Sequence, residues 1–271
     1  MKTSIVTIAA ALTVALIAGC GGSGSTPATS VSGKVADGYL VNATVFLDKN
    51  VNYQLDAGEP TTVTGENGAY TLNVDPTDVG KYPIVAMAIQ GQTIDMDFPN
   101  MTVASSYVLS LPAMAISGTV NSYFISPMSS QLREMMETGK YATMQQAMID
   151  LGAELGMPAG TNMLIDYMVT NNTNMHTSAR NMASLMGSQM AQVFSTSGST
   201  TTVDVNRYRG MMGAIFSNMS SIKGTSPNAQ TAMSNLIGTM NTTLTNMPMM
   251  STGQPFRNMS SAFRGGMMGR R

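Results

Sequence analysis

Residues 48–60 read DKNVNYQLDAGEP, and this stretch places oxygen-bearing side chains on nearly every second residue. With Asp48 as the first position, such side chains stand at positions three, five, nine and twelve, and a backbone carbonyl is available at position seven. An EF-hand loop supplies oxygen ligands to Ca²⁺ at this spacing. Oxygen ligands without His or Cys suit Ca²⁺ better than zinc or copper. The sequence therefore predicts a weak calcium site whose ligands are Asp48, Asn50, Asn52, Gln54, Asp56 and Glu59.

The loop departs from the EF-hand pattern at position six, which is Tyr53 instead of glycine. The backbone turns sharply at this position, and a non-glycine residue with positive φ costs on the order of 1–2 kcal/mol. We therefore expect an affinity in the roughly 10⁻⁴–10⁻³ M range that extracellular calcium modules use. The alternative is a polar turn that holds no ion.

The residues around the loop have the pattern of short β-strands. Apolar and polar residues alternate in residues 31–47 and again in residues 61–74, where Asn67-Gly68 provides a turn signal. Similar runs continue through residues 82–111, separated by glycine and proline. Six or seven short strands with turns between them predict an antiparallel β-sandwich over residues 31–126.

The loop and the strands after it resemble two related groups of β-sandwich modules. These are the calcium-binding B-type repeats of bacterial surface adhesins (the SdrD type) and the carboxypeptidase-regulatory-like domains. Their D-x-N-x-N-G-x-x-D-x-G-E-P loop precedes a G-x-Y hairpin, and only Tyr53 departs from the loop pattern. The resemblance covers residues 31–126 and implies a stalk or adhesive unit, not a catalyst. The matching residues are Asp48, Asn50, Asn52, Asp56, Gly58, Glu59, Pro60, Gly68 and Tyr70.

The N-terminal residues resemble the signal sequence and lipobox of bacterial lipoproteins. Lys2 precedes an apolar run over residues 5–16 that is too short to span a membrane, and the run leads into LIAGC, which ends at Cys20. The resemblance implies cleavage after residue 19 and attachment of diacylglycerol and a further acyl chain, such as palmitate, at Cys20. Gly21 in place of Asp then favours the outer membrane. The alternative is an ordinary secretory signal in which the cysteine occurs by chance.

Cys20 is the only cysteine, so a lipidated chain would have no disulfide to stabilise it. Several acyl chains on one residue are enough for stable anchoring. We expect the membrane to be one partner, through this anchor, and an unidentified envelope or surface protein to be another. Residues 20–30 end in the Gly/Ser-rich sequence GSGSTPATS, which predicts a flexible tether.

The periodicity changes from two to that of a helix after Ser126. Ser126 with Pro127, and later Thr143, predict the starts of two helices. Apolar residues at helical spacing predict a short third helix at residues 161–169 and three more within residues 175–190, 212–222 and 233–244. The Ser/Thr-rich residues 195–202 predict a loop. The sequence thus predicts an α+β protein of two domains, a sandwich followed by a helical domain at residues 127–250, with a disordered tail at residues 251–271.

Methionine is unusually frequent, with 28 residues, most of them after residue 127. One interpretation is that methionine takes the place of leucine in the helical core, where its flexible side chain fills irregular gaps. A second is a groove that binds a partner helix. A third is binding of Cu(I), which thioethers favour. The third interpretation gives the alternative function, a soft-metal-binding or oxidant-buffering envelope protein.

The composition argues against a nucleic-acid-binding protein and against an enzyme. Charged residues make up 11% of the chain, the net charge is −1, and basic residues do not form a cluster that would bind nucleic acid. His176 is the only histidine and we expect it to cap a helix or face solvent. No nucleophile elbow, phosphate-binding loop or zinc-protease motif is present, and the acids Asp150, Glu154 and Asp166 are interpreted as helix surface charge. The sequence therefore predicts a non-enzymatic envelope lipoprotein for surface display, adhesion or scaffolding.

Overall fold

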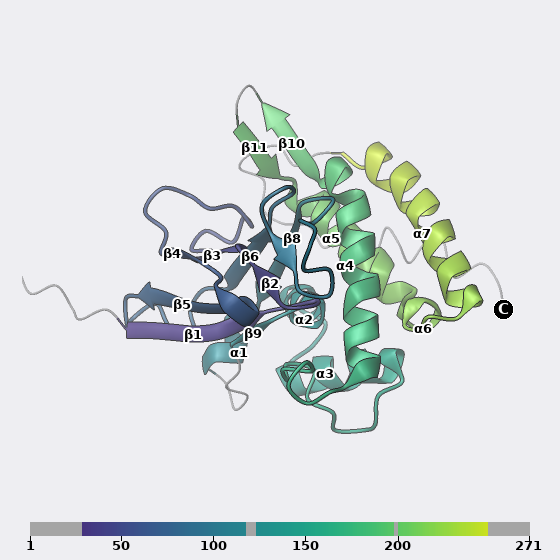
Figure 1. The fold of residues 1–271 in the computed structure, drawn as a ribbon, viewed down its shortest axis with the longest axis horizontal. Coiled ribbons are helices and arrows are strands. Elements are labelled where there is room, and N and C mark those ends of the chain that lie inside the picture. Colours follow the sequence, from purple (N-terminus) through teal and green to yellow (C-terminus); the bar gives the residue numbers. More distant parts are fainter. Residues whose placement is uncertain (1–28, 118–122, 198–199, 249–271) are drawn as a thin grey trace, which may run out of the picture.

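The computed structural model describes residues 29–117, 123–197 and 200–248, which form a mixed α and β protein with several antiparallel sheets. Figure 1 shows the strands on one side of the molecule and the long helices on the other. The predicted signal peptide, Cys20, nearly all of the tether and the tail lie outside the described residues.

The larger sheet contains four strands in the order β4 (Thr61–Val63), β3 (Thr44–Leu47), β6 (Ile84–Ala88) and β8 (Tyr107–Leu111). All neighbouring pairs are antiparallel. Every residue of β8 is buried, and all but one of β6. Such continuous burial requires cover on both faces, and the helical half of the chain packs against β8.

A second sheet has three strands in the order β5 (Ala69–Val74), β1 (Thr29–Val35) and β9 (Phe124–Ile125). Strands β1 and β5 are antiparallel, but β1 and β9 are parallel. This parallel pair departs from the antiparallel arrangement expected from the sequence. Strand β9 follows β8, the last strand of the larger sheet, so the chain comes back to the edge of β1 only after the larger sheet is complete. A separate short pair joins β2 (Leu40–Val41) to β7 (Ile94–Asp95).

The turn predicted at Asn67-Gly68 is confirmed, with φ of 53° at Asn67 and 67° at Gly68. It lies in a short 3₁₀ segment, Glu66–Gly68. The strands on its two sides, β4 and β5, belong to different sheets. The turn therefore carries the chain from one sheet to the other and does not close a hairpin. A side chain at Gly68 would collide with the backbone of the segment at Val35.

The first two long helices begin where the sequence predicts. α2 (Pro127–Glu137) starts with a reciprocal capping box between Ser126 and Ser129. α3 (Met144–Leu155) starts with the Thr143 side chain accepting from Gln146 N–H. Both starts follow from local side-chain hydrogen bonds, which explains why the sequence shows them.

The rest of the helical half contains α4 (Thr173–Val193), α5 (Val205–Ser217), α6 (Met219–Ile222) and α7 (Pro227–Asn246). The predicted fifth helix is divided between α5 and α6. Residues 161–169 form turns, so the helix predicted there is wrong. The loop predicted at residues 195–202 is also wrong, because an antiparallel pair occupies most of it. That pair consists of β10 (Phe194–Ser197) and β11 (Thr200–Val203), and the remaining short helix is α1 (Met114–Ser117).

The buried side chains of the sheets and of the helices form one continuous apolar cluster. Methionine supplies much of its helical part, as the packing interpretation expects. The buried methionines are Met128, Met135, Met144, Met148, Met163, Met175, Met182, Met186, Met190, Met211, Met212, Met219, Met240 and Met247. The pairs 249–250 and 267–268 lie outside the described residues.

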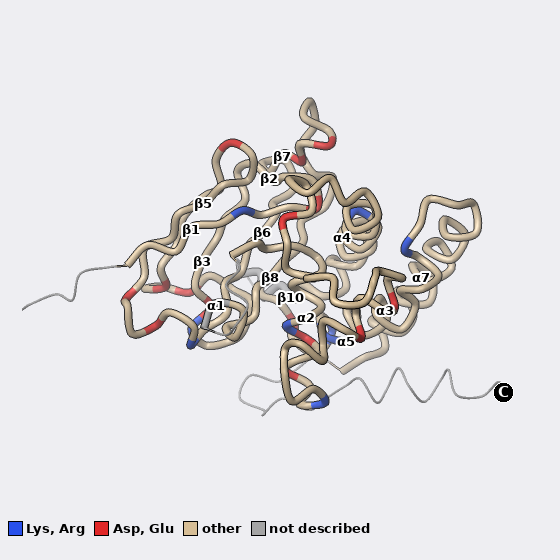
Figure 2. The backbone as a smooth tube through the Cα atoms, turned by 90° about the horizontal axis from the view of Figure 1, so that it is seen from below, with Lys and Arg blue, Asp and Glu red and all other residues tan. Residues whose placement is uncertain are grey.

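Charges are few in the described chain, as Figure 2 shows. Within the same residues, none of the helices has the length and apolar character needed to cross a membrane.

Candidate metal-binding loop

The predicted calcium loop connects β3 to β4 and is organised around Asp48, which follows the last residue of β3. The Asp48 side chain is fully buried. Its carboxylate accepts hydrogen bonds from the backbone N–H groups of Asn52 at 2.9 Å and Tyr53 at 3.1 Å. The chain therefore curls around this carboxylate, with the fifth and sixth positions of the loop facing the first.

Three further predicted ligands converge in the same loop. The side-chain amides of Asn50 and Asn52 both donate to Oδ2 of Asp56, each at 2.7 Å. Oδ1 of Asn52 accepts the backbone N–H of Gln54 at 2.8 Å. The side chains at positions three, five and nine thus point toward one another.

Glu59 closes the loop. Its Oε1 accepts the backbone N–H of Lys49 at 2.7 Å, and its Oε2 accepts that of Asp56 at 3.0 Å. Burial raises the pKa of Glu59, and the nearby negative charges of Asp48 and Asp56 raise it further. The first, ninth and twelfth positions are therefore close enough for their charges to interact.

The backbone conformation predicted at position six is confirmed. Tyr53 has φ of 63°, in the left-handed region that glycine usually occupies. Val51 also lies in this region, with φ of 60°, as does Gly58, with φ of 90°. The loop thus has three residues in the left-handed region, of which only Gly58 is glycine.

The loop keeps capacity for a cation beyond its internal hydrogen bonds. A carboxylate has about four acceptor positions. Asp48 uses three of them, with Asn52, Tyr53 and Arg133, and Oδ1 of Asp56 accepts no hydrogen bond from the described residues. Rotation of the two asparagine amides would present their oxygens in place of their NH₂ groups. Carboxylate, amide and backbone oxygens together make the mixed set that Ca²⁺ accepts, so the residues fit this ion.

Carboxylates alone would not make this site. In the ranges the structure describes, no three His, Cys, Asp or Glu side chains stand close enough to hold a metal ion by themselves. A cation in this loop would depend on the amide oxygens of Asn50 and Asn52 and on the Gln54 carbonyl.

Tyr53 also connects the loop to the helices. Its ring is fully buried, with its centroid 4.5 Å from that of Tyr208 on α5. The guanidinium of Arg133 on α2 lies 3.7 Å from the centre of the same ring, and the Tyr53 hydroxyl donates to Glu134. The residue that breaks the calcium-loop pattern is therefore a wedge between the loop and two helices.

A buried ionic network surrounds this wedge. Arg133 donates to Asp48 Oδ2 at 3.0 Å and to Glu137 Oε1 at 2.8 Å, with its own side chain fully buried. Arg209 pairs with Glu134 at 3.1 Å and also contacts Glu137. Three acids thus face two arginines, and the network ties the first residue of the loop to α2 and α5.

The sequence does not single out the residues of this network, which are Arg133, Glu134, Glu137 and Arg209. One signal was present, because Arg133 and Glu137 are four residues apart on a predicted helix in a chain with few charges. Their partner Asp48 is 85 residues away from Arg133. No local spacing reveals a contact at that distance.

The histidine and the three acids that the sequence offers as candidate catalytic residues lie outside this loop. Nε2 of His176 lies 2.7 Å from Asp97 Oδ2, and the histidine ring stacks on Tyr167. It therefore neither caps α4 nor simply faces solvent. Asp166 accepts from the Tyr39 hydroxyl and pairs with Lys34, whereas Asp150 and Glu154 are exposed. These acids form no pair.

Comparison with protein-family models, with curated proteins and with solved structures gives no match for this chain.

Proposed function

We propose that this chain is a non-enzymatic, lipid-anchored protein of the bacterial envelope, with a calcium-stabilised β-sandwich that serves surface display, adhesion or scaffolding. The observation that carries the proposal is that four predicted ligand residues contact one another within the loop, with the amide groups of Asn50 and Asn52 on Asp56 and the Asn52 N–H on Asp48. A side-chain arrangement of this kind is of use to a chain without disulfides, because an ion then cross-links the loop.

The loop would hold Ca²⁺ through Asp48, Asp56 and Glu59 together with the amide and carbonyl oxygens between them. The ion would neutralise the three carboxylates that now repel one another. The chain's own residues would extend the effect, since Tyr53 and Arg133 join the loop to α2 and α5. Ordering the loop would then stiffen both the sheets and the helices.

Two features support the sandwich and the order of a β half followed by a helical half within this proposal, although the two halves share one apolar core. The chain passes from the larger sheet to the smaller at Asn67-Gly68, as a sandwich requires. All of the helices longer than one turn in the described part of the chain follow residue 126. A β module and a helical module in sequence, behind a Gly/Ser tether, would suit display away from a membrane.

The packing of methionine favours this function over soft-metal binding. The described methionines of the helices mostly lie in the apolar core, where leucine would be expected in other proteins. A thioether there contributes dispersion contacts and fills gaps. A copper site or an oxidant buffer would need sulfur atoms that reagents can reach.

The experiment that tests the proposal is lipid labelling and fractionation of the full chain in a Gram-negative host. With an alkyne analogue of palmitate, the native chain should be labelled and should sediment with outer membranes. Cys20→Ser should lose the label and leave the membrane fraction, while the matched tether substitution Ser23→Ala should change neither property. Unlabelled native protein in the soluble fraction would contradict the proposal.

A further inference from the structure

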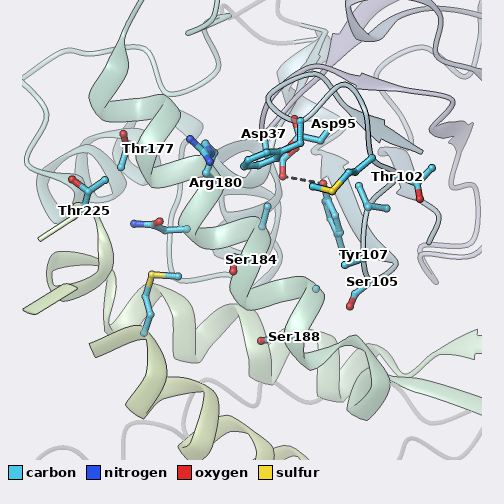
Figure 3. Close-up of a pocket in the computed structure, with 18 residues that line it drawn as sticks. Asp37, Asp95, Thr102, Ser105, Tyr107, Thr177, Arg180, Ser184, Ser188 and Thr225 are labelled. Carbon is cyan, nitrogen blue, oxygen red and sulfur yellow. Dashed lines mark hydrogen bonds between the residues drawn. The ribbon is translucent and has the colours of Figure 1, made fainter. Parts of the chain in front are cut away.

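A cavity of about 630 Å³ lies between the β half of the protein and α4, away from the metal-binding loop. Figure 3 shows Asp37, Asp95 and Tyr107 on its β side and Arg180, Ser184 and Ser188 of α4 facing them. Its volume falls within the range of small-molecule sites, about 300–1,000 Å³. None of the functional roles discussed above uses this cavity.

The inner end of the cavity holds a buried carboxyl group whose hydrogen bonding is incomplete. Asp37 is 6% exposed and accepts a hydrogen bond from the Tyr107 hydroxyl through Oδ2 at 2.9 Å. Its other oxygen, Oδ1, is buried and has no hydrogen-bond partner among the described residues. A buried polar atom without a partner is costly, so a ligand that bonds to Oδ1 would remove that cost.

The surroundings of Asp37 are negatively charged. Asp95 lines the same cavity, and both Asp95 and Asp97 interact electrostatically with Asp37. Gly38 allows this approach, because a side chain there would collide with the Asp95 carboxylate. Arg180 is the nearby cation, but its Nε pairs with Asp97 at 3.2 Å and its guanidinium lies over the Phe98 ring.

The mouth of the cavity is apolar. Phe98 and Met101 line it and remain 47% and 63% exposed, respectively. Val103 and Met233 add further apolar lining. Exposed apolar side chains beside a polar inner end provide contact area for the carbon skeleton of a ligand.

We propose that this cavity binds a small organic amine, with the ammonium group held by Asp37 and Asp95 and the carbon skeleton between the Phe98–Met101 segment and α4. An ammonium group donates hydrogen bonds, and its positive charge balances the negative charge of two neighbouring carboxylates. A divalent metal ion fits less well, because the cavity lining brings together only two carboxylates, and no three His, Cys, Asp or Glu side chains of the described residues are placed to hold a metal ion.

Protonation at Asp37 gives the binding a specific pH dependence. Burial raises the pKa of Asp37 to about 8, and the charges of Asp95 and Asp97 add to the effect. The other titratable or charged groups around it are Tyr107, Tyr167, His176 and Arg180. The free protein therefore holds a proton on Asp37 at pH 7, and a bound ammonium displaces it. Amine binding should release a proton at pH 7 and should strengthen as the pH rises toward 8.

The test is calorimetric titration of the full chain with phenethylamine and putrescine, against their neutral counterparts 2-phenylethanol and 1,4-butanediol. We expect at least one amine to bind about tenfold or more tightly than its alcohol, as loss of a charge-assisted hydrogen bond implies. Asp37→Asn should weaken amine binding by a similar factor, and Asp150→Asn, an exposed control on α3, should not.

A second pair of variants tests the cavity without altering its acids. Ser184 is exposed on the α4 face that lines the cavity, so Ser184→Phe should fill the space and abolish amine binding without disturbing the core. Ser234→Phe, on an exposed face of α7, should leave binding unchanged. The proposal is overturned if neither amine binds, if amines and alcohols bind equally, or if Asp37→Asn or Ser184→Phe binds amines like the native chain.

Discussion

Tyr53 has two opposing effects on stability, a strained left-handed backbone and a buried ring. Its replacement by glycine shows which of the two is larger. The loop pattern alone treats tyrosine at position six as a defect, because φ of 63° suits glycine. On that basis Tyr53→Gly should stabilise the protein. The structure gives the opposite expectation, because the Tyr53 ring is fully buried between Arg133 and Tyr208.

The magnitude follows from the contacts that the substitution removes. Truncation of a buried aromatic side chain costs about 3–5 kcal/mol. Relief of the left-handed backbone at Tyr53 returns about 1–2 kcal/mol. We therefore expect Tyr53→Gly to lower the free energy of unfolding by about 1–4 kcal/mol. For a chain of this size, the corresponding fall in Tm is roughly 2–16 °C.

The assay is urea denaturation of the purified full chain, monitored by circular dichroism. Val51→Gly is the matched control, because Val51 has φ of 60° but a side chain that is 40% exposed. This control should be neutral or up to about 1 kcal/mol more stable than the native chain. Tyr53→Gly with native or greater stability would refute the role of Tyr53 as a wedge.

Three further substitutions test the energetics of the fold. Asp48→Asn removes one of the two carboxylates that pair with the buried Arg133 and should cost about 1.5–3 kcal/mol in urea denaturation, and a loss below about 1 kcal/mol would contradict the network. Met186→Ala empties a fully buried core position and should cost about 2–5 kcal/mol in the same assay; native stability would mean that this methionine is not packed. Burial raises the pKa of Asp37 in the folded chain to about 8. Between about pH 4 and pH 8 the folded chain therefore holds a proton on Asp37 that the unfolded chain has already lost. The stability that this proton contributes is fully present below about pH 4 and is lost as the pH rises through 8. The Tm of the native chain should therefore fall more between about pH 4 and pH 8 than the Tm of Asp37→Asn. If the Tm of both proteins changes equally with pH, the pKa of Asp37 is not raised.

Features set by neighbouring residues could be predicted from the sequence. The Ser126 and Thr143 caps are formed by hydrogen bonds within three residues, and both helix starts are where we expected them. The turn at Asn67-Gly68 depends on the tolerance of these two residues for positive φ. The left-handed conformation of Tyr53 likewise follows from its place in the pattern of the loop.

Features decided by distant contacts could not be predicted. The apolar residues at 161–169 suggested a helix, but the Tyr167 hydroxyl donates to the Ala36 and Asp37 carbonyls and holds the segment in turns. The partners of Tyr53 lie on α2 and α5, eighty or more residues away in the chain. The cavity beside Asp37 depends on the way α4 packs against the loops of the β half, which local periodicity does not encode.

The most direct test of the calcium loop is the unfolding free energy of the full chain with and without about 5 mM Ca²⁺. An affinity near the middle of the roughly 10⁻⁴–10⁻³ M range predicts an increase of about 1.5 kcal/mol. The increase should vanish in Asp56→Ala and persist in Asp75→Ala, which removes an exposed acid outside the loop. Equal stability of the native chain in the presence and absence of Ca²⁺ would show that the loop is a polar turn that holds no ion.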